Sequence, residues 1–101
     1  MAQATKVATT TEIPPGTGKV VEVGGKTLAV FNADGKFYAI NNTCLHRGGP
    51  LGEGSLSGTT VTCPWHGWEY DVRSGECTMD QSMKVQKFDV TVQGNDLLVD
   101  L

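Results

Sequence analysis

Short segments of alternating apolar and polar residues, separated by glycine-containing turns, run through most of the chain. The segment from Lys19 to Phe31 is interrupted by Gly24-Gly25. Two adjacent glycines between β-branched segments are typical of a tight hairpin, because both can adopt positive φ. A second hairpin is expected at Ala33-Asp34-Gly35, which leads into the apolar positions of 37–40. The pattern therefore predicts three consecutive antiparallel strands up to Asn41.

The other predicted strands are short. They are expected at Thr5–Ala8, near Thr59–Thr62, at Glu69–Val72, at Val85–Val92 and at Leu97–Leu101. Thr9 stands three residues before Glu12, as in a helix N-terminus, but Pro14-Pro15-Gly16 stops any helix within about one turn. No sustained helical periodicity occurs elsewhere. We therefore expect an all-β protein with a glycine-rich loop before Thr59.

Composition narrows the function classes. The chain has 101 residues, eight basic and eleven acidic residues, and a net charge of −3. This length fits a single domain over residues 1–101. No basic run could follow a phosphate backbone, so we expect no nucleic acid partner. No segment is long and apolar enough for a membrane span or a signal-peptide core, so we expect a cytoplasmic protein with no membrane partner.

Four potential metal ligands occur as two mixed pairs. Cys44 and His46 form a Cys-x-His pair, and Cys63 and His66 form a Cys-x-x-His pair after sixteen intervening residues. A lone cysteine or histidine is usually an ordinary packed or surface residue. Two mixed pairs that use both histidines of the chain indicate a four-ligand metal site. Zinc and an iron–sulfur cluster are the alternatives, and familiar zinc fingers instead pair Cys with Cys and His with His.

Glycines are frequent between the two pairs. They are Gly48, Gly49, Gly52, Gly54 and Gly58. At a metal site, residues without side chains allow backbone N–H groups to approach closely, which is the interpretation we favour over a flexible connector.

The two pairs resemble the motif of the Rieske family, which is Cys-x-His, about sixteen residues, Cys-x-x-His and a glycine, here Gly67. The resemblance implies one 2Fe–2S cluster per chain. It implies that Cys44 and Cys63 bind one iron and that His46 and His66 bind the other.

The same resemblance implies a Rieske-type antiparallel β-sandwich. A cluster-binding subdomain would be formed by two loops at one tip, at about residues 43–52 and 62–70.

The chain departs from the high-potential Rieske proteins of respiratory complexes at several positions. Gly49 and Trp65 stand where those proteins have disulfide-forming cysteines, and Trp68 stands where they have a serine. Tyr70 matches their tyrosine, which can donate a hydrogen bond to a ligand cysteine. Rieske centres span roughly −150 to +300 mV, and we expect the low end of that range. The third cysteine, Cys77, is expected to be a free thiol outside the site.

The histidine count separates carriers from enzymes within this family. Rieske oxygenases hold a second, mononuclear iron with two histidines and a carboxylate, and this chain has no histidine beyond His46 and His66. The resemblance implies a one-electron carrier with no catalytic residues, not an enzyme. The chain is most similar to ferredoxins that pass electrons from an NAD(P)H-dependent flavin or iron–sulfur reductase to a terminal oxygenase, such as a ring-hydroxylating dioxygenase.

Two alternatives stay open on the sequence. The first is the Rieske-type small subunit of an NAD(P)H nitrite reductase, which the ligand motif does not distinguish from an oxygenase ferredoxin. The second is a zinc-stabilised interaction module, which the ligand spacing disfavours.

Apolar residues flank the predicted ligands and are expected to form a rim for brief docking on a small interface. They are Leu45, Pro50, Leu51 and Trp65. For Leu45 and Trp65, packing over the cluster to exclude water is an equal alternative.

Overall fold

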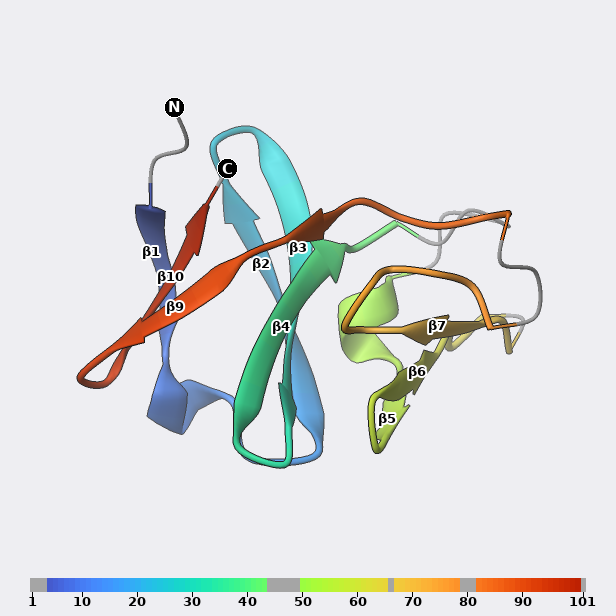
Figure 1. Cartoon of the computed structure of the whole chain (residues 1–101), viewed down its shortest axis with the longest axis horizontal. Helices are drawn as coiled ribbons and strands as arrows, with labels where there is room; N and C mark the ends of the chain where they lie inside the picture. The colour runs from blue at the N-terminus through green and yellow to red at the C-terminus, as the bar shows by residue number, and fades with distance from the viewer. Residues whose placement is uncertain (1–3, 44–49, 66, 79–81, 101) are drawn as a thin grey trace.

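Antiparallel strands make up most of the regular structure in the computed structural model (Figure 1), which describes residues 4–43, 50–65, 67–78 and 82–100. These residues form three sheets and two short 3-10 helices, with no α-helix among them. The all-β prediction is therefore confirmed. No helix in the described part of the chain is long and apolar enough to span a bilayer.

The central sheet has the strand order β2-β3-β4-β8. Its strands are β2 at Thr17–Val23, β3 at Lys26–Ala33, β4 at Lys36–Asn41 and β8 at Lys87–Phe88. Gly24 and Gly25 have φ of 57° and 77° in the β2–β3 turn, and Asp34 and Gly35 have φ of 57° and 89° in the β3–β4 turn. Both predicted hairpins are confirmed by the antiparallel pairing of β2 with β3 and of β3 with β4. Turn residues that tolerate positive φ determine this pairing locally.

A second sheet, with the order β1-β10-β9, packs against the central one. It contains β1 at Ala4–Thr9, β9 at Val90–Gln93 and β10 at Asp96–Asp100. The 3-10 helix η1, Thr10–Glu12, follows β1, and the Thr9 backbone N–H donates to Glu12 Oε1 at 3.0 Å. The helix signal at Thr9 thus produces one turn that ends before the prolines.

Strand β3 is buried on both faces, and this places the third sheet. Leu28 and Val30 pack in the core that lies between the first two sheets. Ala29 and Phe31 belong to a second core that also contains Cys63. Because successive side chains of a strand alternate between faces, β3 joins the sandwich to the remaining part of the molecule.

The third sheet, β5-β6-β7, forms a smaller subdomain beside the sandwich (Figure 1, right). Its elements are the 3-10 helix η2 at Leu51–Glu53, β5 at Ser55–Ser57, β6 at Thr60–Thr62 and β7 at Glu69–Asp71. This is the expected sandwich with a subdomain at one tip. Strand β5 and helix η2 were not predicted, because Leu56 is the only apolar residue of β5 and glycines stand on both sides of that strand.

Two of the loop glycines allow close packing within this subdomain. A Cβ on Gly54 would lie 2.2 Å from the Thr62 carbonyl oxygen, and one on Gly52 would lie 2.7 Å from Val20 Cγ2. Gly58 has φ of 61° and turns β5 into β6. Close packing therefore explains the glycines at 52 and 54, and turn geometry explains Gly58. Gly48 and Gly49 lie outside the described residues.

The prediction of a single strand at Val85–Val92 is wrong, because this segment contains two strands, β8 and β9. The chain pairs with β4 at β8, is interrupted at Asp89, and then pairs with β10 as β9. Val85 packs in the core of the small subdomain, whereas Phe88 packs in the sandwich core. The alternating pattern is real, but it does not show that a strand passes from one sheet to another.

Candidate metal centre

The second ligand loop is our name for residues 63–68, which contain the predicted ligands Cys63 and His66 and connect β6 to β7. Cys63 follows β6 directly and is 2% exposed. Its N–H donates to the Trp68 carbonyl at 2.7 Å, and the Gly67 N–H donates to the Cys63 carbonyl at 3.1 Å. Gly67 has φ of 78°, a conformation that favours glycine. These bonds fix Cys63 at the base of the loop, with its side chain in the subdomain core.

The first ligand loop is closed at its base, although residues 44–49 themselves lie outside the described residues. Thr43 and Pro50 form an antiparallel bridge. The Leu51 N–H donates to the Asn42 carbonyl at 2.8 Å, and the Gly52 N–H donates to Asn42 Oδ1 at 2.7 Å. The chain therefore leaves and re-enters the fold at nearly the same place.

Of the four predicted ligands, the structure describes Cys63 alone. Cys44, His46 and His66 lie outside the described residues, and no group of three or more potential ligands is found among the residues that are described. Cys63 is buried and free of a disulfide. Its core also contains Leu51, at the end of the first loop. A sheltered thiol close to a second closed loop suits a cluster held between two loops, while the full ligand set stays a prediction.

Comparison with known proteins identifies the family. Residues 3–89 match the Rieske [2Fe-2S] domain. The chain belongs to this family. The biphenyl dioxygenase ferredoxin subunit of Pseudomonas sp. (strain KKS102) is 34% identical to it over 98 residues, which cover 95% of this chain and 90% of the relative.

Solved structures give the same answer for the fold of this Rieske protein. The ferredoxin of carbazole 1,9a-dioxygenase from Nocardioides aromaticivorans IC177 has a TM-score of 0.89 and 31% identity, covering 96% of each chain. A chain in a complex of reduced oxygenase and oxidized ferredoxin in carbazole 1,9a-dioxygenase has a TM-score of 0.86 and 32% identity, covering 96% of this chain and 92% of that one.

The cofactor of this Rieske ferredoxin is a 2Fe–2S cluster, and its role is electron transfer. When bound, the cluster takes up and releases one electron at a time. Cys63 would supply a sheltered sulfur ligand for it, and the hydrogen bonds of the Cys63 backbone with Gly67 and Trp68 hold that residue in place.

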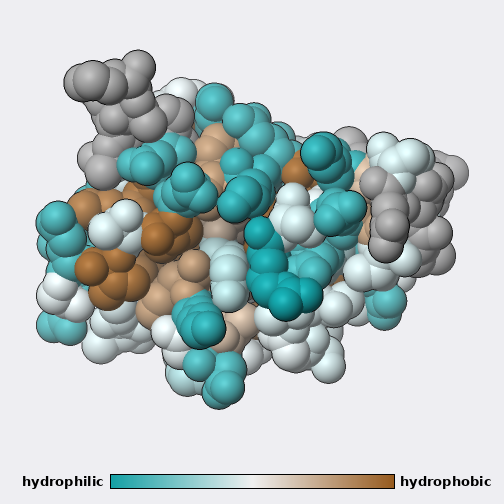
Figure 2. Space-filling model, in the orientation of Figure 1, coloured by the Kyte–Doolittle hydropathy of each residue, from teal (hydrophilic) through white to brown (hydrophobic). Residues whose placement is uncertain are grey.

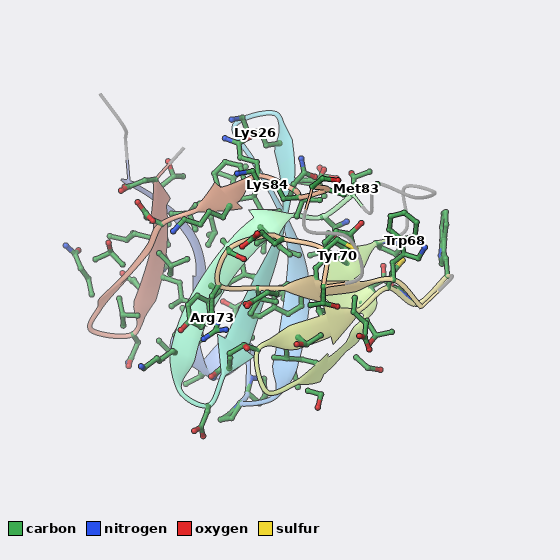
Figure 3. The ribbon with its side chains drawn as sticks, turned by 45° about the vertical axis from the view of Figure 1, so that its right-hand side comes forward. Lys26, Trp68, Tyr70, Arg73, Met83 and Lys84 are labelled. Atoms are coloured by element: carbon green, nitrogen blue, oxygen red, sulfur yellow. The ribbon has the colours of Figure 1, made fainter. Side chains whose placement is uncertain are left out.

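Tyr70 and Cys77 pack near Cys63. Both side chains are fully buried in the core that contains Cys63, and the two residues form an antiparallel bridge. Cys77 is a free thiol, as predicted. Figure 3 shows Tyr70 and Trp68 near the loop end of β7, with Arg73 farther along the chain. The position of Tyr70 suits the role expected of the matching tyrosine, namely donation to a ligand sulfur.

The predicted apolar rim is only partly present. Trp65 is 56% exposed, and Pro50 is half-buried. The prediction that Leu51 belongs to the rim is wrong, because its side chain is fully buried in the subdomain core. Leu45 lies outside the described residues. Trp68, at the position where the respiratory proteins have a serine, packs half-buried against the same core.

An ion pair fixes the end of β7 that is remote from the ligand loop. Arg73 Nη2 lies 2.9 Å from Asp71 Oδ2, and Arg73 Nε donates to Asp71 Oδ1 at 3.1 Å. The hydrogen bonds from Arg73 lower the pKa of the Asp71 carboxyl, against a smaller opposing effect of desolvation. Asp71 therefore stays ionised and holds the turn that leads to Cys77.

Sequence reasoning did not single out Asn42 for the site. It is one of two buried polar residues among those described, and it joins both ends of the first loop. Its position two residues before Cys44 was the available signal, because a short polar side chain next to a loop often bonds to the backbone.

Proposed function

We propose that this Rieske ferredoxin carries single electrons from an NAD(P)H-dependent flavin or iron–sulfur reductase to a terminal oxygenase, such as a ring-hydroxylating dioxygenase, in the cytoplasm. The observation that carries the proposal is the likeness of nearly the whole chain to dioxygenase ferredoxin subunits, one of them seen in a complex with its oxygenase. In this proposal residues 1–101 are one Rieske domain whose cluster-binding loops are at about 43–52 and 62–70.

The proposed ligands are Cys44, His46, Cys63 and His66. The buried thiol of Cys63 and the closed base of the first loop support this set. The thiolates would bind one iron and the imidazoles the other, so the centre would be less negative and easier to reduce than one with four cysteines.

The proposed docking surface is the exposed part of the second ligand loop. Pro64, Trp65 and Gly67 are exposed next to the buried Cys63. An exposed tryptophan next to a redox centre gives a partner apolar contact area close to the site of electron transfer, and aromatic residues often dominate binding energy at small interfaces.

Trp65→Ala tests this function. We expect kcat/KM for the ferredoxin to fall about tenfold or more with the biphenyl dioxygenase oxygenase of strain KKS102 and its reductase, since loss of an aromatic anchor typically costs at least about 1.4 kcal/mol. Steady-state NAD(P)H oxidation coupled to product formation provides the measurement. Val92→Ala is the matched control, because Val92 is the other exposed large apolar residue among those described.

Equal activity of the two variants would argue against docking through Trp65. Electron delivery to a sirohaem nitrite reductase, but to no oxygenase, would favour the nitrite reductase subunit instead. Stoichiometric zinc without iron would favour the structural module.

A further inference from the structure

Asn42 closes the base of the first ligand loop through its side chain as well as its backbone. The side chain is 8% exposed, and its Oδ1 accepts the Gly52 N–H at 2.7 Å. The Asn42 carbonyl accepts the Leu51 N–H at 2.8 Å, and its own N–H donates to the Thr27 carbonyl at 3.1 Å. Asn42 is thus bonded both to the far end of the loop and to the start of β3.

These bonds surround the segment that carries two predicted ligands. The Thr43–Pro50 bridge lies just inside them, and Cys44 and His46 lie between the bridged residues in sequence. The Thr43 N–H donates to Asn41 Oδ1 at 2.9 Å, which fixes the last step before Cys44. We call Asn42, Thr43, Pro50, Leu51 and Gly52 the neck of the first loop.

We infer that Asn42 is a positioning residue, whose side-chain oxygen sets the geometry of the neck and thereby how firmly the chain holds the cluster. This inference rests on the proposed ligand set. Among the described residues, the Asn42 side chain bonds to Gly52. It acts through the backbone of Gly52.

Gly52 is tightly packed within the neck. A Cβ on Gly52 would lie 2.7 Å from Val20 Cγ2 and 3.1 Å from Asn42 Oδ1, so Gly52 is packed between β2 and the asparagine. A buried N–H without an acceptor destabilises the folded state, because it has lost its hydrogen bonds to water and gained none in return. Without the Asn42 oxygen, the neck therefore opens or shifts to let the Gly52 N–H reach water.

The chain contains a matched control. Asn32 is 4% exposed, and its side chain makes two hydrogen bonds, donating to the Ile13 carbonyl and accepting the Gly35 N–H, both at 2.8 Å. In the register of the β3–β4 hairpin, Asn32 pairs with Phe37 near the turn, whereas Asn41 pairs with Leu28 at the other end. Loss of Asn32 should therefore destabilise the sandwich without changing the neck.

The test compares Asn42→Ala, Asn42→Asp and Asn32→Ala in the cluster-containing protein. The first readout is the rate of iron loss to a chelator, the second is the EPR spectrum of the reduced cluster, and the third is hydrogen exchange at Leu51 and Gly52. For Asn42→Ala we expect iron loss about tenfold faster than in the unmodified protein, an altered EPR line shape and faster exchange. Asn42→Asp keeps an acceptor for Gly52 and should restore all three toward the original values.

Asn32→Ala should lower the melting temperature while leaving the EPR line shape and the neck exchange unchanged. The inference is overturned if Asn42→Ala and Asn32→Ala give the same spectrum and the same iron-loss rate. If Asn42→Ala does not accumulate, Asn42→Ser, whose shorter side chain lengthens the bond to Gly52, is measured in its place with the same expected direction. Absence of a Rieske signal from the unmodified protein would instead refute the ligand set.

Discussion

At the scale of single residues, burial alone does not separate Cys63, a predicted ligand, from Cys77, which is predicted to lie outside the site. Cys63 is 2% exposed and Cys77 is fully buried, and both are free thiols in the same core. What separates them is local backbone structure. Cys63 stands at the base of a tight loop that contains Gly67 at positive φ, whereas the Cys77 N–H donates to the Met83 carbonyl as part of ordinary packing.

Cysteine substitutions turn this difference into a prediction. Cys44→Ser and Cys63→Ser should each abolish cluster binding, because a serine hydroxyl does not replace a thiolate ligand of iron. Cys77→Ser should keep a full complement of iron and acid-labile sulfide, with a stability loss of about 1–3 kcal/mol for burying a hydroxyl. Iron and sulfide analysis of the three purified variants provides the measurement. Loss of the cluster in Cys77→Ser would show that the ligands were chosen wrongly.

At the scale of elements, the accuracy of sequence reasoning depended on whether the determining signal was local. The β2–β3 and β3–β4 hairpins were predictable because Gly24-Gly25 and Asp34-Gly35 encode their own turns. Strand β5 was not, because it is recognisable only by its pairing with β6. The division of Val85–Val92 between two sheets was hidden for the same reason, since the alternation continues while the pairing partner changes from β4 to β10.

The two glycines that flank β5 give a prediction at this scale. Gly54→Ala should destabilise the protein by about 1–3 kcal/mol or more through overpacking, because its Cβ would lie 2.2 Å from the Thr62 carbonyl oxygen. Gly58→Ala has open space around its Cβ and carries only the strain of a positive φ, about 1–2 kcal/mol. Chemical denaturation of both variants makes the comparison. A smaller loss for Gly54→Ala than for Gly58→Ala would contradict the close packing of β5 on β6.

At the scale of the whole molecule, two cores share one strand. Strand β3 contributes one face to the sandwich core and the other to the core that contains Cys63, so the sandwich and the small subdomain pack on the same strand. Figure 2 shows the apolar surface of this view gathered at the left, over the sheet of β9 and β10 and away from the small subdomain.

The sequence predicted the family and its cofactor better than it predicted the packing around Cys63. The two mixed ligand pairs and Gly67 are encoded within short motifs, so the family and its cofactor followed from them. The burial of Leu51 and the bonds of Asn42 to Leu51 and Gly52 depend on how residues outside the motif fold together. No spacing within the motif contains that information.

The reduction potential of the purified protein at pH 7 tests the central claim most directly. Two imidazole ligands, with glycine and tryptophan at the positions of the respiratory disulfide, predict a one-electron couple at the low end of the roughly −150 to +300 mV range of Rieske centres. Protein-film voltammetry on the iron-containing protein measures it. A couple near about −400 mV, as in ferredoxins with four cysteine ligands, would contradict the account.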